Sequence, residues 1–551
     1  MRPPFDVFSD MGHRSQARRC GKMNPDRSNV IRGDSGVVGT TGEDALILGI
    51  DLGTTSTKAV AYDVRGRMVA SSSQPTITHY PRPMWAHFEP EELWGAAAAA
   101  VRDVVSHVGD PARIKSVAVA SFAEAGVPID ANGVPTYNMI AWFDRRTIPQ
   151  ADWLVETIGE QRLFERSGLA LQPIFTLCKF LWLKENEPDA WARTRGWLMA
   201  DSYIAWRLGG APASDFSQAA RTLAFDLQQL TWDTDLVRRV GLDPAILSPV
   251  MPAGTAIGTV NKAGAEATGL AEGTIVGVGG HDHVCGAFAA GVTQHGAVLD
   301  SMGTAEALFV ALDAPIWEQE FGWAGYTQGA HVVAGKYYAF GGLYTSGASV
   351  DWIRSVTGRE DRMSLTGEAE AVPPGSYGAT FMPHLRLGGP PNIDGRSRGA
   401  FLGLTTDIDQ GALVRAVYEG LAYEARFSIE PLVAFAGVDT LPDFTVIGGS
   451  ARNELLLKIK ASVMNRPHHV MAIHEATALG AAMLGGLSAG VYRNADDVRS
   501  TIALKSTTIE PEPEAARFYE EFYQSVYKQL YATLKPLNHA IYAQVVDENA
   551  E

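Results

Sequence analysis

The sequence predicts an α/β protein built from two related halves. An apolar run at 46–50 leads into a loop of glycine and threonine and then into a second apolar run, a pattern typical of two strands joined by a turn. A similar strand–loop–strand unit recurs at 297–312, again with a Gly-Thr pair in its loop. Strands alternate with helical patterns across both halves, which indicates layers of sheet and helix. The two units indicate either two related domains facing each other or a coincidence between short turns.

The elements of the first half are expected in a regular order. The run at 46–50 is continuously apolar, as in a strand buried on both faces. A second strand at 59–62 follows the loop directly, and a turn then leads to a third strand from Met68. We therefore expect no helix to begin after the loop at 51–58. The other expected elements are a strand at 115–121, helices near 150–165 and 177–190, and a strand at 274–278.

The second half repeats this alternation of strands and helices. Strands are expected at 297–300 and 306–312, on either side of a loop at 301–305. Later elements are a Gly/Pro-rich loop at 373–399, a helix at 409–435, a strand at 444–447, and helices near 452–464 and 476–490. Aromatic residues recur at three- and four-residue spacings between 513 and 543, which predicts an amphipathic helix. We interpret this stripe as a docking surface rather than a ligand site.

The composition excludes several classes of protein. Hydrophobic residues make up 46% of the 551 residues and charged residues 20%, as in average globular proteins, so wholesale disorder is excluded. The formal net charge of −16 argues against nucleic-acid binding, because phosphate contacts need clustered cations. Three cysteines far apart indicate reduced thiols and a cytoplasmic protein. No apolar run approaches the ~18 residues of a membrane span, so no membrane partner is expected.

The same patterns divide the chain into four parts. Residues 1–43 mix charged, glycine, serine and proline residues without periodicity and are expected to be a disordered extension. A first domain is expected at 44–292, a second domain at 293–500 and a helical tail at 501–551.

The loop at 51–58 has the composition of a phosphate-binding turn. Glycine and small hydroxyl residues at a strand end offer backbone N–H groups and hydroxyl donors to phosphate oxygens. Asp51 stands where the strand ends and is placed to hold Mg²⁺, which prefers few protein ligands and retains water. The P-loop pattern is absent, because Lys58 follows Gly53 without a second glycine. An ordinary turn is the alternative.

Two further glycine-rich segments follow expected strands. The segment 277–286 contains Asp282, which we expect to project from the strand end toward a ligand. Its neighbours His281, His283 and Cys285 invite a zinc interpretation, but no second ligand cluster accompanies them, so a hydrogen-bonding role for His283 and burial of Cys285 are favoured. The segment 446–453 runs from a strand through glycines into a helix, and is either a seat for a nucleotide base and ribose or a tight turn.

Taken in order along the chain, these segments resemble the FGGY family of carbohydrate kinases, within the actin-like ATPase superfamily. The resemblance is carried by the segments 49–58, 142–146, 179–186, 280–282, 302–304, 415–420, 448–451 and 478–482. It implies two actin-like α/β domains with mixed β-sheets flanked by helices, facing across a deep cleft that closes on ATP and a sugar. The first domain would bind the sugar and the second the nucleotide.

The resemblance also implies the roles of individual residues. Asp282 matches the catalytic base that accepts the proton of the attacking sugar hydroxyl, a role typically worth ~10²–10⁴-fold in rate. Asp51 matches the residue that organises Mg²⁺. The residues expected to bind ATP are Gly53, Thr54, Thr55, Lys58, Gly303, Thr304, Gly448, Gly449 and Asn453.

The expected substrate is a neutral sugar, a ketose such as a pentulose, or a polyol. Glu124 and Asp144 are expected to hydrogen-bond sugar hydroxyls, and Trp85 either to stack on the sugar or to pack in the core. The sequence departs from the patterns of glycerol and xylulose kinases near Ala123 and Gly388, so the sugar itself stays open. An actin-like ATP-binding scaffold and a sugar sensor without phosphotransfer are the alternatives. Dimers are common among relatives, so a homodimer is one candidate state, but the sequence itself does not decide the oligomeric state.

Overall fold

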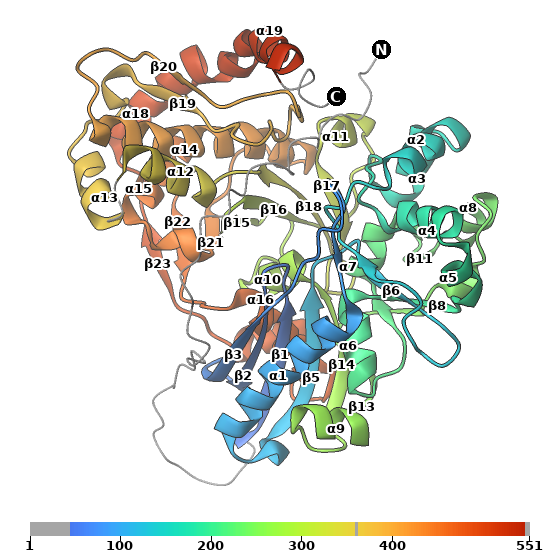
Figure 1. Ribbon diagram of the computed structural model, residues 1–551. Helices are drawn as coiled ribbons and strands as arrows, with labels where there is room; N and C mark the ends of the chain where they lie inside the picture. The colour runs from blue at the N-terminus through green and yellow to red at the C-terminus, as the bar shows by residue number, and fades with distance from the viewer. Residues whose placement is uncertain (1–43, 359–361, 546–551) are drawn as a thin grey trace.

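The computed structural model describes residues 44–358 and 362–545, arranged around two mixed β-sheets (Figure 1). The expected extension at 1–43 lies outside the described residues. The first sheet has six strands in the order β13-β14-β5-β1-β2-β3. These strands are β1 (Leu46–Leu52), β2 (Ser56–Asp63), β3 (Met68–Pro75), β5 (Ile114–Ser121), β13 (Ala256–Thr259) and β14 (Ile275–His281).

The second sheet has seven strands in the order β17-β18-β16-β15-β21-β22-β23. They are β15 (Val298–Met302), β16 (Glu306–Leu312), β17 (Thr327–Ala330), β18 (Tyr337–Leu343), β21 (Phe444–Ile447), β22 (His468–Met471) and β23 (Ser506–Ile509). Strand β23 lies in the region expected to be a purely helical tail. That expectation was wrong because this strand completes the second sheet at the edge, pairing antiparallel with β22.

The two sheets share one pattern of strand directions. From β13 to β3, neighbouring pairs are antiparallel, parallel, parallel, antiparallel and antiparallel. From β23 to β18, the pairs follow the same sequence of directions. Each sheet therefore contains the expected hairpin with a Gly-Thr loop in the same place, and in neither does a helix follow that loop. This correspondence supports two related domains over a coincidence of short turns.

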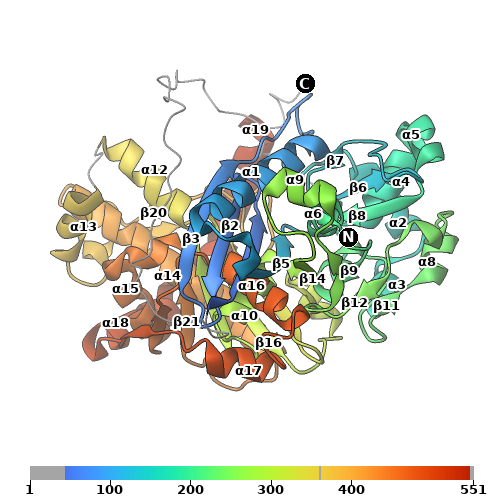
Figure 2. The ribbon, with the colours of Figure 1, turned by 90° about the horizontal axis from the view of Figure 1, so that it is seen from below.

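Alternate residues of β1 pack into different hydrophobic cores, as the two-residue period of a strand dictates. Leu48 and Ile50 pack with α1 (Pro90–Val108), which contacts β2 and β3. Ile47 instead joins a core that includes residues of α10 (Asp282–Ala289) and α16 (Ala476–Ser488). Figure 2 shows α1 over the outer side of the first sheet. A strand covered on both faces explains the uninterrupted apolar run in the sequence.

Helix α16 comes late in the chain, yet it packs on the first sheet, against β1, β5 and β14, and on α10. Figure 1 shows α10 and α16 where the two sheets meet. The approach is so close that a Cβ on Gly49 would lie 1.8 Å from the carbonyl oxygen of Ala478, and one on Gly480 would lie 2.0 Å from that of Cys285. Glycine is therefore required at both positions to join the two domains.

The structure also contains the helices α2 (Ile148–Thr157), α3 (Glu160–Ser167), α4 (Thr176–Asn186), α5 (Pro188–Arg193), α8 (Thr234–Arg239), α12 (Gly347–Thr357), α14 (Gln410–Phe435), α15 (Glu454–Met464), α18 (Pro513–Phe522) and α19 (Lys528–Val545). The single helix expected near 150–165 is two helices, because Gly159 has a positive φ of 89° between them. The aromatic stripe of the tail docks on α14, where Tyr523 and Tyr527 stack on Tyr423. No helix in the described ranges is long and apolar enough to span a membrane.

Candidate active site

Three adjacent parallel strands of the first sheet end at one edge. Leu52 pairs in register with Ser121, and Ser121 pairs with His281, so β1, β5 and β14 finish side by side. Ligands of α/β proteins bind outside the carboxyl ends of such strands. Asp51, Glu124 and Asp282 lie at or directly after these three ends, which is why residues far apart in the sequence share one site.

Asp282 is the first residue of α10 and follows β14 directly. The backbone N–H of His283 donates to its Oδ1 at 2.6 Å, and Nε2 of His281 lies 3.2 Å from the same oxygen. Burial raises the pKa of Asp282, and the Glu124 carboxylate adds to the rise, while His283 and Arg221 oppose it. Burial also lowers the pKa of His281 well below its usual value, so this ring is neutral. Burial thus leaves Asp282 with a raised pKa despite these opposing charges, and a carboxylate that accepts a proton more readily suits a general base.

Asp51 interacts electrostatically with Asp282. Burial raises the pKa of Asp51 to about 7, with Asp282 and Glu475 adding to the rise and Lys58 opposing it. Lys58 reaches α16, where its Nζ lies 2.7 Å from Glu475 Oε2 just before the helix. Two neighbouring carboxylates at a strand end are the hard oxygen donors that Mg²⁺ prefers, and a divalent cation would offset their repulsion. The donor set therefore fits Mg²⁺.

The two loops expected to hold ATP phosphates have exposed backbone at the strand ends. The β1–β2 loop closes with a hydrogen bond from Gly53 N to Ser56 O, and Thr55 is exposed. The β15–β16 loop closes from Gly303 N to Ala305 O, and Thr304 is exposed. Thr54 is half-buried beside Gly53. Both loops can present N–H and hydroxyl donors to an anion.

The third expected nucleotide segment follows β21, which is parallel to β15 and adjacent to it. Gly448 has a positive φ of 104°, and a Cβ there would lie 2.4 Å from Met302 O, so glycine lets this turn approach the phosphate loop. Gly449 is exposed with open space around its Cα. Asn453 caps α15, accepting from Leu456 N at 3.2 Å, so its oxygen has a structural partner already.

Glu124, which is expected to contact the sugar, is held firmly in a strained conformation. Its φ of 63° lies in the left-handed region, which costs ~1–2 kcal/mol for a residue with a Cβ. Thr176 Oγ1 and Lys179 Nζ both donate to its carbonyl oxygen, at 3.0 and 2.8 Å. Its carboxylate accepts from Arg221 Nε at 2.6 Å, and both side chains are buried. Arg221 also donates to Thr327 of β17, so this pair joins the first domain to the second sheet.

Asp144 is occupied by local contacts. Its Oδ1 accepts from Arg146 Nε at 2.9 Å and its Oδ2 from Arg146 Nη2 at 2.7 Å, while the backbone N–H of Ala86 also donates to Oδ2. The guanidinium groups of Arg146 and Arg82 lie 4.0 and 4.1 Å from the centroid of the Trp85 ring. This packing is what the core alternative for Trp85 predicts, and contact with a sugar stays a prediction for both Trp85 and Asp144.

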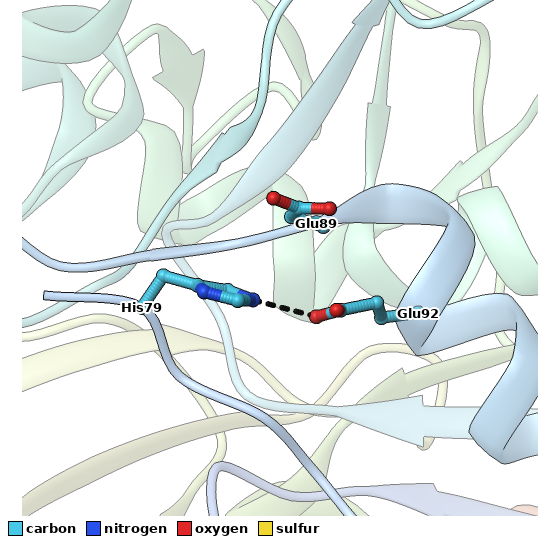
Figure 3. A group of neighbouring side chains, drawn as sticks. All are labelled: His79, Glu89 and Glu92. Carbon is cyan, nitrogen blue, oxygen red and sulfur yellow. Dashed lines mark hydrogen bonds and ion pairs between the residues drawn. The ribbon is translucent and has the colours of Figure 1, made fainter. Parts of the chain in front are cut away.

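The segment before Trp85 is fixed to the start of α1 by a hydrogen-bonded contact between a histidine and a glutamate. His79 Nε2 lies 2.6 Å from Glu92 Oε2, with Glu89 beside them (Figure 3). Among the described residues, this is the one group of three His, Cys, Asp or Glu side chains whose ligand atoms all lie within 4.8 Å. Both glutamates lie at the start of α1, where the helix dipole stabilises carboxylates, so local structure explains them. His281, His283 and Cys285 form no such group.

The similarity of the chain to known proteins follows this geometry. Residues 46–289 match the model for the N-terminal domain of the FGGY family of carbohydrate kinases, and residues 298–489 match the model for its C-terminal domain. The chain belongs to this family. It is a carbohydrate kinase with the two-domain, actin-like α/β fold of that family, as the resemblance in the sequence predicted.

Individual relatives match this carbohydrate kinase over nearly their full length. Glycerol kinase 2 of Thermotoga maritima is 29% identical over 497 residues, which cover 88% of this chain and 98% of the relative. The xylulose kinase of Bacillus subtilis is 27% identical over 498 residues, covering 90% and 98%. The crystal structure of xylulose kinase from Rhodospirillum rubrum matches with a TM-score of 0.81 at 27% identity, covering 90% of this kinase and 100% of that chain.

Sequence reasoning missed two cations of the kinase's sugar side, Lys179 and Arg221. Lys179 begins one of the segments that carry the family resemblance, and that signal was available. Arg221 has no local pattern around it, because its partners Glu124 and Thr327 lie about a hundred residues away on either side. Burial lowers the pKa of Lys179 to about 8, although Glu124 and Asp144 oppose this shift.

Proposed function

We propose that this kinase transfers the γ-phosphate of ATP to a hydroxyl group of a neutral ketose or polyol, with Asp282 as the general base. One observation carries the proposal. Asp282 interacts electrostatically both with Asp51, beside the β1–β2 phosphate loop, and with Glu124, on the sugar side. A base that removes a proton from the acceptor hydroxyl must be close to both substrates, and the interactions of Asp282 with both groups support this position.

In the proposed reaction, the hydroxyl oxygen of the sugar forms a bond to the γ-phosphorus while the bond from that phosphorus to the bridging oxygen of ADP breaks. The hydroxyl proton passes to the Asp282 carboxylate. The raised pKa of Asp282 favours this transfer, because a base accepts a proton more readily as its pKa approaches the working pH. Most of the remaining rate enhancement comes from alignment of the substrates and neutralisation of phosphate charge.

The nucleotide is assigned to the exposed turns at the strand ends. The residues proposed to contact ATP are Gly53, Thr54, Thr55, Lys58, Gly303, Thr304, Gly448, Gly449 and Asn453. Asp51 is proposed to hold Mg²⁺, through its bound water or directly, and the ion would neutralise charge on the phosphates. Lys58 also pairs with Glu475 just before α16, so this lysine would position α16 beside the phosphates as well as contact ATP.

The charges on the sugar side support a neutral substrate. Three carboxylates, those of Glu124, Asp144 and Asp282, are matched by three cationic side chains, Arg146, Arg221 and Lys179, which interact with them. A substrate carboxylate would find no cation without a partner among these groups, whereas hydroxyl groups can bond to the remaining lone pairs. The names of the relatives also support a neutral substrate, since glycerol is a polyol and xylulose is a pentulose.

The test is ADP release in a coupled assay across pentuloses, hexuloses and C3–C5 polyols. Asp282→Asn keeps the shape of the side chain but cannot accept the proton, and we expect a fall of ~10²–10⁴-fold in kcat for the best substrate. Asp235→Asn on α8, whose side chain is 91% exposed, is the matched control and should keep full activity. Full activity in Asp282→Asn would refute the role of the base, and ADP release that no sugar stimulates would favour the scaffold or sensor alternatives. Light scattering on the same samples would test whether the protein is a homodimer.

A further inference from the structure

Below the β15–β16 phosphate loop lies a fully buried group of three charged side chains. Lys460 of α15 contacts Asp300 of β15, and its Nζ lies 2.7 Å from Glu306 Oε1 of β16. The side chains of Lys460 and Asp300 are 0% exposed and that of Glu306 is 1% exposed. Asp300 and Glu306 stand on the two arms of the hairpin whose tip is Gly303-Thr304.

The group also connects to the segment that precedes α12. Ser346 Oγ donates to Glu306 Oε2 at 2.8 Å, so both carboxylate oxygens of Glu306 are engaged. The backbone of the same segment returns to the loop, because Ser346 N donates to Thr304 O at 3.0 Å and Gly347 N to Gly303 O at 3.1 Å. One carboxylate thereby fixes the end of the hairpin and the start of α12 relative to each other.

Lys460 adds the third segment. It projects from α15, the helix that begins directly after the Gly448-Gly449 turn and is capped by Asn453. At the surface the same two segments meet again, where Ser450 Oγ donates to Gly303 O at 3.5 Å. The loop at 303–305, the start of α12 and the segment 448–460 are thus held together by the buried Lys460 ammonium group and by hydrogen bonds to the carbonyl oxygens of Gly303 and Thr304.

The two buried carboxylates of this group depend on the positive charge of Lys460. Burial acts to lower the pKa of Lys460, but Asp300 and Glu306 outweigh it and hold the pKa above its usual value, so the ammonium stays charged. Burial and the neighbouring Glu306 raise the pKa of Asp300. Without the lysine, two buried carboxylates would face each other across the base of the hairpin with no counter-charge, and the strands would separate or one group would take up a proton.

We propose that Lys460 is a positioning residue for ATP, which sets the distance between the Gly303-Thr304 loop and the Gly448-Gly449 turn through Asp300 and Glu306. The inference rests on the proposed function, because it takes these two turns to hold the nucleotide. A purely structural role predicts loss of stability alone. A positioning role predicts weaker nucleotide binding even in a variant that stays folded.

The experiment measures calorimetric binding of Mg²⁺ with the non-hydrolysable analogue adenylyl imidodiphosphate, together with thermal unfolding. Lys460→Met should raise the Kd by about tenfold or more, and Arg415→Met is the matched control. Arg415 is also buried and paired, with Nε 2.9 Å from Glu419 Oε1, but it lies in α14 against the tail helix α18. Arg415→Met should lower the melting temperature comparably and leave the Kd within about twofold.

The triple variant D300N/K460M/E306Q removes the charges while nearly keeping the volumes. We expect the triple variant to recover stability but still to bind the analogue weakly. Near-native binding by the triple variant would overturn the proposal. Equal effects of Lys460→Met and Arg415→Met on the Kd would also overturn it. Should the triple variant not fold, Glu306→Gln alone, which preserves side-chain shape, has to weaken binding for the proposal to stand. Thr304→Ala separates the role of Lys460 from the assignment of the phosphate loop. If Thr304→Ala leaves the Kd for the analogue unchanged, the assignment of the phosphate loop itself fails.

Discussion

Removing the guanidinium group of Arg221 tests how the proposed sugar-binding residue Glu124 is held in place. Arg221 and Glu124 are 5% and 7% exposed at their side chains, and Nη2 of Arg221 lies 2.6 Å from Glu124 Oε1. Removing one partner of such a buried pair typically costs about 3–5 kcal/mol, since the other charge stays buried without compensation. Arg221→Met also removes the hydrogen bond to Thr327, so the upper part of this range is expected.

The loss is measurable by unfolding and by kinetics. At roughly 2–4 °C per kcal/mol for a domain of this size, a loss of about 4–5 kcal/mol should lower the melting temperature of Arg221→Met by roughly 8–20 °C. Because Arg221 orients the Glu124 carboxylate, we also expect the KM for the sugar to rise by about tenfold or more, with a smaller change in the KM for ATP.

A double-mutant cycle separates the pair from its surroundings. Glu124→Gln combined with Arg221→Met leaves no buried charge at this position, so the double variant should be more stable than Arg221→Met alone. A loss below about 1 kcal/mol in Arg221→Met, or strictly additive effects in the cycle, would show that the two side chains do not depend on each other.

The remaining predictions concern the domain junction and the response to pH. Gly49→Ala should destabilise the protein by at least ~1–3 kcal/mol, because its methyl group would lie 1.8 Å from Ala478 O. Gly95→Ala, at an exposed position of α1 with open space around it, should instead stabilise the protein by ~0.5–1 kcal/mol. Equal melting temperatures for the two variants would contradict the close approach of α16. Burial, with Asp215 adding to it, raises the pKa of Asp201 to about 8, so the folded protein keeps a proton that the unfolded chain releases near its ordinary pKa of ~3.9. The stability contributed by protonated Asp201 is therefore complete below about pH 4 and is lost as the pH rises to about 8; in urea unfolding, Asp201→Asn should reduce that decline, and an unchanged pH slope would argue against it.

Much of the fold could be read from local patterns. The strands at 46–50 and 306–312 lie within β1 and β16, and the helix at 409–435 matches α14 to within one residue. The spacing of hydrophobic residues and the presence of turn residues are local properties, so both can be recognised in a single sequence. Gly159 shows the limit: its positive φ divides an expected helix in two, and a glycine within a helical pattern does not by itself say that the chain turns there.

Residues of the candidate site could be predicted from the sequence where a local motif contains them. They could not be predicted where their partners come close only in the folded protein. Asp51 and Asp282 stand beside glycine-rich segments, and the structure brings them into electrostatic interaction at the ends of β1 and β14, on either side of β5. Lys460 sits in an ordinary amphipathic helix, and its partners belong to a hairpin 150 or more residues earlier in the chain. Only the assembled second sheet brings those charges together.

The sequence alone determined that this chain alternates strands and helices in two halves and where its short glycine-rich loops lie, because both depend on neighbours along the chain. Tertiary structure alone decided that α16 from the second half packs on the first sheet, that β23 completes the second, and that Arg221 pairs with Glu124. In such contacts, segments that are distant in the sequence pair buried charges and fill buried space. These segments come together only when the whole chain has folded.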